Sequence, residues 1–158
     1  MKKNMNNKYL SLGLILLVTF LASGIGSFAT SSFKEPWYSE IILPSFNPPS
    51  WVFGPVWTIL YILMSFAIWK IWIKFFDLKI LKIYLVHLVF NGSWSIIFFG
   101  FHQPFFALID LLIILGFVIY LTLAYKKLDK ISFYLMIPYN LWTSYAFVLN
   151  FSIVILNK

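Results

Sequence analysis

The sequence predicts an all-α membrane protein, namely a five-transmembrane-helix bundle with a long first loop. The composition is one reason, because 61% of the 158 residues are hydrophobic and only 11% are charged, against about 25% charged in a soluble domain. The mean hydropathy of +0.88 is another. The third is that the apolar residues form five runs, each near the roughly 20 residues with which a helix crosses a bilayer. A transmembrane barrel would instead need many short segments with alternating hydrophobicity.

The five expected spans lie in one domain that covers residues 1–158. In chain order they are Tyr9–Ala29, Trp51–Phe75, Ile80–Gly100, Phe105–Tyr125 and Ile131–Leu156. The connections between them are short, except for the first loop, Thr30–Ser50.

The first run has an alternative interpretation as a secretory signal peptide, since "MKKNMNNK" precedes it and "SFATSS" follows. We favour a span, because the run is longer than the usual apolar core of about 7–15 residues in a signal peptide. Small residues in this run have the spacing with which helices approach closely, a common pattern that is also compatible with a homodimer. These residues are Ala22, Ser23, Gly26 and Ser27.

The lysines predict the orientation in the membrane. With five spans, ten of the twelve fall on one side, and only Lys34 and Lys158 fall on the other. The ten are Lys2, Lys3, Lys8, Lys70, Lys74, Lys79, Lys82, Lys126, Lys127 and Lys130. Because cytoplasmic loops are rich in Lys and Arg, we expect the N-terminus in the cytoplasm, and the first loop and the C-terminus outside.

Several function classes are disfavoured by what the chain lacks. It has no cysteine, so it has no disulfide, no thiolate nucleophile and no cysteine-based metal site. It has no arginine for bidentate readout of phosphate or guanine, so its net charge of +7 does not indicate nucleic-acid binding. Five acids and two histidines leave little for acid–base catalysis, and no phosphate-binding glycine loop or zinc spacing is present. We expect no metal site and no conventional enzyme.

Aromatic and polar side chains form a stripe on three of the spans. Such side chains usually face the interior of a membrane bundle, where facing stripes would line a small-molecule site. The second span offers Trp57, Tyr61, Met64, Ser65 and Ile68; the third offers His87, Asn91, Trp94, Ser95 and Phe98; the fifth offers Pro138, Trp142, Ala146 and Asn150.

Each of these polar residues also has a structural interpretation. Asn and Ser often only join membrane helices, and Trp and Tyr often lie in interfacial belts. His87 is either an axial haem ligand or a hydrogen-bonded structural residue. Asp110 is a functional carboxylate in the membrane or, as we favour, an interfacial one stabilised by a helix N-terminus. Pro138 frees a backbone carbonyl of the fifth helix and is expected to kink it.

Three blocks of the sequence resemble the TspO/MBR family of tryptophan-rich sensory proteins and translocator proteins. "WYSEIILPSFNPPSWVFGPVWTILYILMSFAIWKIW" (Trp37–Trp72) is similar to the family's first loop and second helix. "FNGSWSIIFF" (Phe90–Phe99) resembles its third-helix pattern, and "PYNLWTSYAFVLNFSIVILN" (Pro138–Asn157) resembles its fifth helix. The first and fourth helices carry little signature.

The resemblance implies a five-helix bundle, often dimeric, whose pocket opens under the first loop. It implies binding of porphyrins, haem precursors and other hydrophobic ligands, with no required cofactor. Carried over by motif position, the expected ligand-binding residues are Tyr38, Pro48, Phe53, Trp57, Asn91, Trp142 and Ala146. If the protein degrades porphyrin in light, as the resemblance to bacterial members suggests, Trp57 and Trp142 are the residues expected to take part.

The proline-rich first loop fits such a pocket physically. Pro44, Pro48 and Pro49 reduce the ordering entropy that is lost when the loop covers a ligand. We expect Trp51 and Phe53 to form the apolar underside of the loop. We expect Trp57 and Trp142 to clamp a planar ring and Asn91 to hydrogen-bond an oxygen on it.

One departure from the family pattern concerns sterols. The proposed cholesterol motif needs a tyrosine followed by Lys or Arg within about five residues. Phe151 stands where the tyrosine is expected, and Lys158 lies too far along the chain, so sterol binding of this type is not expected.

Three functions therefore compete at this stage. The first is binding and sensing of tetrapyrroles or similar lipophilic ligands, the second is light-dependent porphyrin breakdown, and the third is transport of such ligands across the bilayer. We expect the protein in the bacterial inner membrane, with the lipid bilayer, hydrophobic small molecules and a homodimer as its partners.

Overall fold

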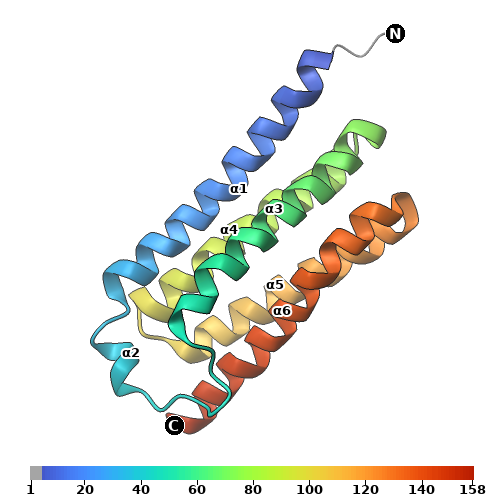
Figure 1. Cartoon of the computed structure of the whole chain (residues 1–158). Helices are drawn as coiled ribbons and strands as arrows, with labels where there is room; N and C mark the ends of the chain where they lie inside the picture. Colours follow the sequence, from blue (N-terminus) through green and yellow to red (C-terminus); the bar gives the residue numbers. More distant parts are fainter. Residues whose placement is uncertain (1–4) are drawn as a thin grey trace.

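The computed structural model describes residues 5–158 and shows a bundle of long helices (Figure 1). Lys2 and Lys3 of the orientation argument lie outside the described residues. The elements are α1 (Met5–Phe33), α2 (Trp37–Glu40), α3 (Ser50–Phe75), α4 (Leu78–Ser95), the π-helical turn η1 (Ile96–Gly100), α5 (Pro104–Leu128) and α6 (Lys130–Leu156). Within the described residues there is no strand.

The prediction of five membrane-spanning helices is confirmed. Five helices of the described chain are long and apolar enough to cross a bilayer, and each expected run lies inside one of them. Figure 1 shows that the start of α1, the α3–α4 turn and the α5–α6 turn lie at one end of the bundle. The described members of the group of ten lysines lie in these three places. We call this end of the bundle the lysine end. At the other end, α2 and the C-terminus lie together.

Each long helix packs mainly against two neighbouring helices. α1 contacts α3 and α4, α3 contacts α6, and α5 lies between α4 and α6. Two cores fill the interior. The larger includes Met64, Ile68, Val118 and Met136, each at most 1% exposed.

The close approach of α1 to α4 depends on small residues of the predicted pattern. A Cβ added to Gly26 would lie 3.2 Å from Ser95 Oγ, and one added to Gly92 would lie 3.5 Å from the Ala22 carbonyl oxygen. The small face of α1 is therefore used within the chain, against α4.

The first loop is shorter than expected. Helix α1 continues through Thr30 to Phe33, because the backbone N–H of Lys34 still bonds to the Thr30 carbonyl at 3.1 Å. The connection to α3 then covers residues 34–49 and contains α2. The expected loop Thr30–Ser50 was too long because its small and hydroxyl residues resemble loop composition. The side chain of Thr30 instead bonds back to the Gly26 carbonyl at 2.9 Å, a contact that a helix interior accommodates.

Side-chain hydrogen bonds hold the connection between α1 and α3 against α6 at two places. The Asn157 side chain accepts a hydrogen bond from Ile42 N at 2.8 Å and donates one to the Ile42 carbonyl at 2.9 Å. The Tyr145 hydroxyl donates to the Phe46 carbonyl at 2.7 Å. The connection therefore lies as a cover over this end of the bundle.

An ion-pair cluster holds the lysine end together. Asp129 caps α6 by accepting hydrogen bonds from Ser132 N at 2.9 Å and from the Ser132 hydroxyl at 3.0 Å. Its carboxylate also pairs with Lys74, and Lys70 Nζ lies 3.9 Å away. Burial alone raises the pKa of Asp129, but the hydrogen bonds from Lys74 and Ser132 and the charge of Lys70 outweigh it and lower the pKa to about 2. Lys70 and Lys74 thus stabilise the fold at this end of the bundle.

Replacing Asp129 by Asn should lower the free energy of unfolding by about 1–2 kcal/mol at pH 7, a figure reduced for screening at the half-exposed Lys74. The pKa of Asp129 rises from about 2 in the folded state to about 3.8 in the unfolded state. The stabilisation is therefore complete above pH 4 and is lost as the pH falls toward 2. Unfolding of detergent-solubilised protein at several pH values measures the difference.

The matched control is Asp77→Asn, which alters a helix cap without an ion pair among the described residues, since Asp77 accepts from Ile80 N at 3.0 Å. A difference between wild type and Asp129→Asn that is the same at pH 7 and pH 2.5 contradicts the ion-pair assignment.

Candidate functional site

The seven expected ligand-binding residues come from four elements and the connection at the end of the bundle that α2 covers. Tyr38 lies on α2 and Pro48 in the connection, while Phe53 and Trp57 lie on α3. Asn91 lies on α4, and Trp142 and Ala146 lie on α6. The structure gathers them into three adjoining groups, described in turn from the inside outward.

The innermost group is a chain of buried hydrogen bonds that joins three helices. Asn91 Oδ1 accepts from the Tyr61 hydroxyl at 2.6 Å, and Asn91 Nδ2 donates to the Tyr139 hydroxyl at 2.9 Å. The Tyr139 hydroxyl lies 2.6 Å from His87 Nε2. A phenol oxygen has two acceptor lone pairs, so the tautomer of His87 decides whether Tyr139 or His87 Nε2 is the donor in this contact. All four side chains are at most 6% exposed.

This arrangement supports the structural interpretation of His87. Its side chain is 0% exposed, its Nε2 lies within hydrogen-bonding distance of Tyr139, and its Nδ1 is buried without a partner. The described residues contain no group of three His, Cys, Asp or Glu that would hold a metal ion.

The second group is an aromatic wall on α3 and α6. The Trp57 ring stacks on Tyr61 at 5.4 Å with a 27° interplanar angle, and meets Tyr139 edge-on at 6.1 Å. Phe53 meets Trp142 edge-on at 5.9 Å, and Trp142 lies against Tyr145 at 5.5 Å. The wall therefore rests on the buried chain through Trp57 and touches the cover through Tyr145.

One polar atom in this wall has no partner. Trp142 Nε1 is buried and makes no hydrogen bond. An unpaired buried donor costs about 1–3 kcal/mol. The indole N–H is therefore a ready donor for an acceptor atom on any molecule that reaches it.

The third group lies under α2. The Tyr38 hydroxyl donates to Asn47 Oδ1 at 3.3 Å, and Asn47 Nδ2 donates to the Pro48 carbonyl at 3.2 Å. The Tyr38 ring packs at 5.6 Å from Phe99, and burial raises the pKa of Tyr38. The structure thus places Tyr38 in the smaller core, with Phe53 at its border.

The π-helical turn makes this smaller core. A π turn changes the direction of successive side chains relative to an α-helix, and here the neighbours Phe98 and Phe99 are both buried. Trp94 stacks on Phe98 at 4.9 Å, and its Nε1 donates to Asn150 Oδ1 at 3.1 Å. Nothing in the sequence analysis indicated this turn.

Two expectations about the wall were wrong. Trp51 is 76% exposed and does not form the underside of the loop, because α3 begins at Ser50 and turns its first residues outward. On α6 the expected stripe began one position early: Pro138 is exposed, and the buried face instead runs through Tyr139. The missed residue was detectable, because Tyr139, Thr143, Ala146 and Asn150 also have helical spacing.

Asp110 lies inside its span. It is the seventh residue of α5, beyond the first turn in which a helix N-terminus stabilises a carboxylate. The Ser93 hydroxyl lies 3.1 Å from Asp110 Oδ1, and Oδ2 is buried without a partner. The stabilisation by a helix N-terminus that we favoured is therefore wrong, and Asp110 is a buried carboxylate between α4 and α5.

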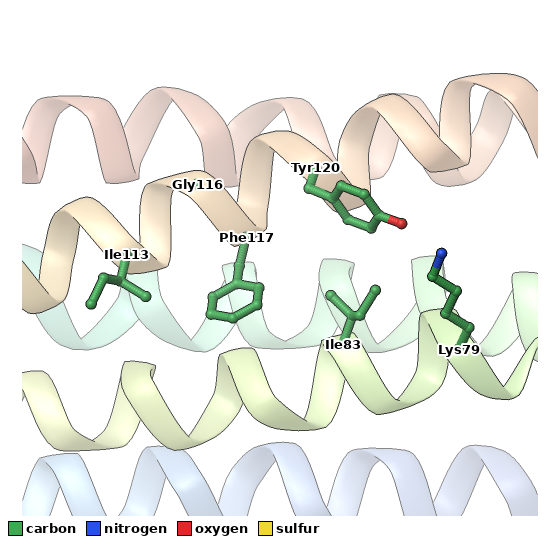
Figure 2. A pocket seen from close by; sticks show the side chains of 6 residues that line it. All are labelled: Lys79, Ile83, Ile113, Gly116, Phe117 and Tyr120. Atoms are coloured by element: carbon green, nitrogen blue, oxygen red, sulfur yellow. The ribbon is translucent and has the colours of Figure 1, made fainter.

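Two hollows on the described part of the chain lie elsewhere. One, of about 570 Å³, lies between α4 and α5 (Figure 2). The other, of about 170 Å³, is lined by residues of α1, α3 and α4 that include Ser11, Ile15 and Trp72. None of the seven expected residues lines either hollow. In this structure Phe53 packs against Trp142, and Trp57 packs against the tyrosines bonded to Asn91.

Comparison with known proteins gives consistent matches along the chain. The profile of the TspO/MBR family matches residues 14–156. The "Tryptophan-rich protein TspO" of Chlorobaculum tepidum is 34% identical over 97% of this chain and 99% of its own length. The human "Translocator protein" is 34% identical over 84% of each chain. The "Tryptophan-rich sensory protein" of Cereibacter sphaeroides is 35% identical over 90% of this chain and 91% of its own.

Replacing Tyr139 by Phe should lower the free energy of unfolding by about 1–3 kcal/mol, because Asn91 Nδ2 and His87 Nε2 would both lose a buried partner. Tyr134→Phe is the matched control, since Tyr134 lies on the same helix and is 66% exposed. Thermal unfolding in detergent compares the two variants. Equal midpoints for both would mean that the buried chain does not stabilise the bundle.

Proposed function

This chain belongs to the TspO/MBR family of multi-pass membrane proteins, and from that premise we propose that it binds tetrapyrroles and similar planar lipophilic ligands beneath the connection between α1 and α3. The observation that carries the proposal is the buried, unpaired Nε1 of Trp142, which lies in an aromatic wall directly under a cover. Among the described residues of this wall, it is the one buried donor without a hydrogen-bond partner.

The wall fits a planar ring with polar edges. When the cover lifts, the ring would insert beside Trp57 and Trp142, and a carboxylate on its edge would accept the Trp142 Nε1 hydrogen bond. Aromatic stacking contributes about 0.5–1.5 kcal/mol beyond burial of area. The Phe53 and Ala146 side chains border the same space, and both are partly buried.

Asn91 has a different part in this proposal from the direct contact first expected. Its carboxamide already bonds to Tyr61 and Tyr139. It therefore acts by fixing Tyr61, on which Trp57 stacks. A direct hydrogen bond from Asn91 to a ligand stays a prediction. It requires that Tyr61 or Tyr139 first releases its hydrogen bond to Asn91.

The cover is the element that admits the ligand. Tyr145 holds Phe46, Asn157 holds Ile42, and Asn47 links Tyr38 to Pro48. Tyr145 also touches Trp142. Lifting the cover therefore breaks the hydrogen bond between Tyr145 and Phe46 at the edge of the aromatic wall. The prolines of the connection limit the conformations that it adopts when it opens.

We also propose the orientation in the membrane, with the lysine end in the cytoplasm and the cover outside, facing away from the cytoplasm of a bacterial inner membrane. The reason is the concentration of lysines at the lysine end. A ligand would then reach the site from the outer face or from the adjacent half of the bilayer.

Protoporphyrin in the dark should quench tryptophan fluorescence saturably, with a Kd that rises about 5–10-fold in Trp142→Phe, because that variant keeps the ring but loses the Nε1 donor. Trp72→Phe is the control, since it removes one tryptophan near the lysine end. Non-saturating quenching, or an equal Kd in all three proteins, would count against the site.

Repeating the titration in light tests porphyrin breakdown, which would slow in Trp57→Phe and Trp142→Phe.

Single cysteines test the orientation cleanly because the chain has none of its own. Ser39→Cys on α2 should react with a membrane-impermeant maleimide in intact cells, whereas Leu78→Cys at the α3–α4 turn should react only after permeabilisation. Both positions are exposed. The reverse labelling pattern would invert the proposed topology.

A further inference from the structure

The hollow between α4 and α5 is separate from the proposed ligand site and has a composition of its own. It has a volume of about 570 Å³, within the range of about 300–1,000 Å³ that small-molecule sites occupy. Figure 2 shows its lining side chains, which come from these two helices alone. They are Lys79 and Ile83 of α4, and Ile113, Gly116, Phe117 and Tyr120 of α5.

The lining changes from polar to apolar along the helices. Lys79 and Tyr120 lie at one end of the hollow, and Ile113 lies at the other (Figure 2). Lys79 is the second residue of α4, so the polar end is the lysine end of the bundle. Ile113 is seven residues from Tyr120, which is about 10 Å along a helix. The hollow therefore runs from the membrane surface toward the interior of the bilayer.

A glycine provides the room. A Cβ added to Gly116 would have no atom within 4 Å, apart from its own helix. Phe117 beside it is fixed by Phe90, whose ring lies 5.7 Å away. The hollow is thus an open surface groove whose floor is the glycine backbone and whose wall is an aromatic ring.

The cation at the polar end has no carboxylate partner among the described residues. The ion pairs of that part of the chain join Lys34 to Glu35, and Lys70 and Lys74 to Asp129. Asp77, two residues from Lys79, caps α4 through Ile80 N. The Lys79 ammonium is therefore available to an anion at the membrane surface.

We propose that this groove binds one anionic phospholipid. The phosphate accepts hydrogen bonds from Lys79 Nζ and the Tyr120 hydroxyl, and an acyl chain lies along Ile83, Phe117 and Ile113. Charge complementarity and the polar-to-apolar order match a lipid, because basic recesses between membrane helices favour anionic headgroups and an apolar wall offers nothing to a water-soluble anion. The site acts independently of the porphyrin proposal, since its residues lie on α4 and α5 toward the lysine end.

Native mass spectrometry of the full chain in detergent tests this with phosphatidylglycerol and phosphatidylcholine of identical acyl chains. Phosphatidylglycerol should give one tight adduct, bound about fivefold more weakly by Lys79→Gln, which loses the attraction of one lysine. Gly116→Leu should abolish the adduct by filling the groove. Lys130→Gln, an exposed lysine at the start of α6, is the charge-matched control and should bind as wild type does.

Equal adducts in wild type and both groove variants would overturn the proposal. So would equal affinity for the two lipids, or displacement of the adduct by millimolar glycerol 3-phosphate, which would show a free-anion site. Loss of a protein dimer in Gly116→Leu with lipid adducts unchanged would assign the groove to a second copy instead. The circular dichroism spectrum of Gly116→Leu verifies its fold, and Lys79→Gln tests the headgroup without changing the groove.

Discussion

The Asn91 side chain stands where three helices of the bundle meet. Water is scarce in the centre of a bilayer, so a buried polar group there is stabilised when it finds a partner inside the protein. Asn91 on α4 hydrogen-bonds to Tyr61 of α3 and to Tyr139 of α6. The Tyr139 hydroxyl in turn hydrogen-bonds with His87. These bonds fix how each helix is rotated about its axis. They thereby fix the direction in which Trp57 leaves α3.

A second constraint follows from that rotation. With Tyr61 and Tyr139 turned inward, Trp57 and Trp142 fall on the rim, between the sealed interior and the cover. These two side chains are only partly buried, whereas Tyr61 and Tyr139 are at most 6% exposed. The bundle therefore combines a packed, hydrogen-bonded interior with an aromatic edge that lies closer to the surface. In the proposed function, this edge is the part that meets a planar ligand.

The sequence predicted the helices better than their rotations. The five spans were predictable because a bilayer leaves an apolar run of about 20 residues few alternatives to a helix. The buried face of α3 was also predictable, since Tyr61, Met64, Ser65 and Ile68 have a clear helical period. The face of α6 was predicted one position early, because the stripe was started at Pro138, although Tyr139, Thr143 and Asn150 have helical spacing too. The π turn at Ile96–Gly100 and the helical end of α1 depend on contacts with other elements, which a local pattern does not contain.

The clasp between Asn157 and Ile42 has a consequence for the end of the chain. Its two hydrogen bonds join the middle of the connection to a residue just beyond the last turn of α6. The connection cannot lift at this point unless the Asn157 carboxamide releases Ile42. In the proposed function, opening of the ligand site would therefore change the hydrogen bonding of the residue that follows α6. An affinity tag fused directly after Lys158 would lie next to this clasp, so the position of the tag matters for the design of a binding experiment.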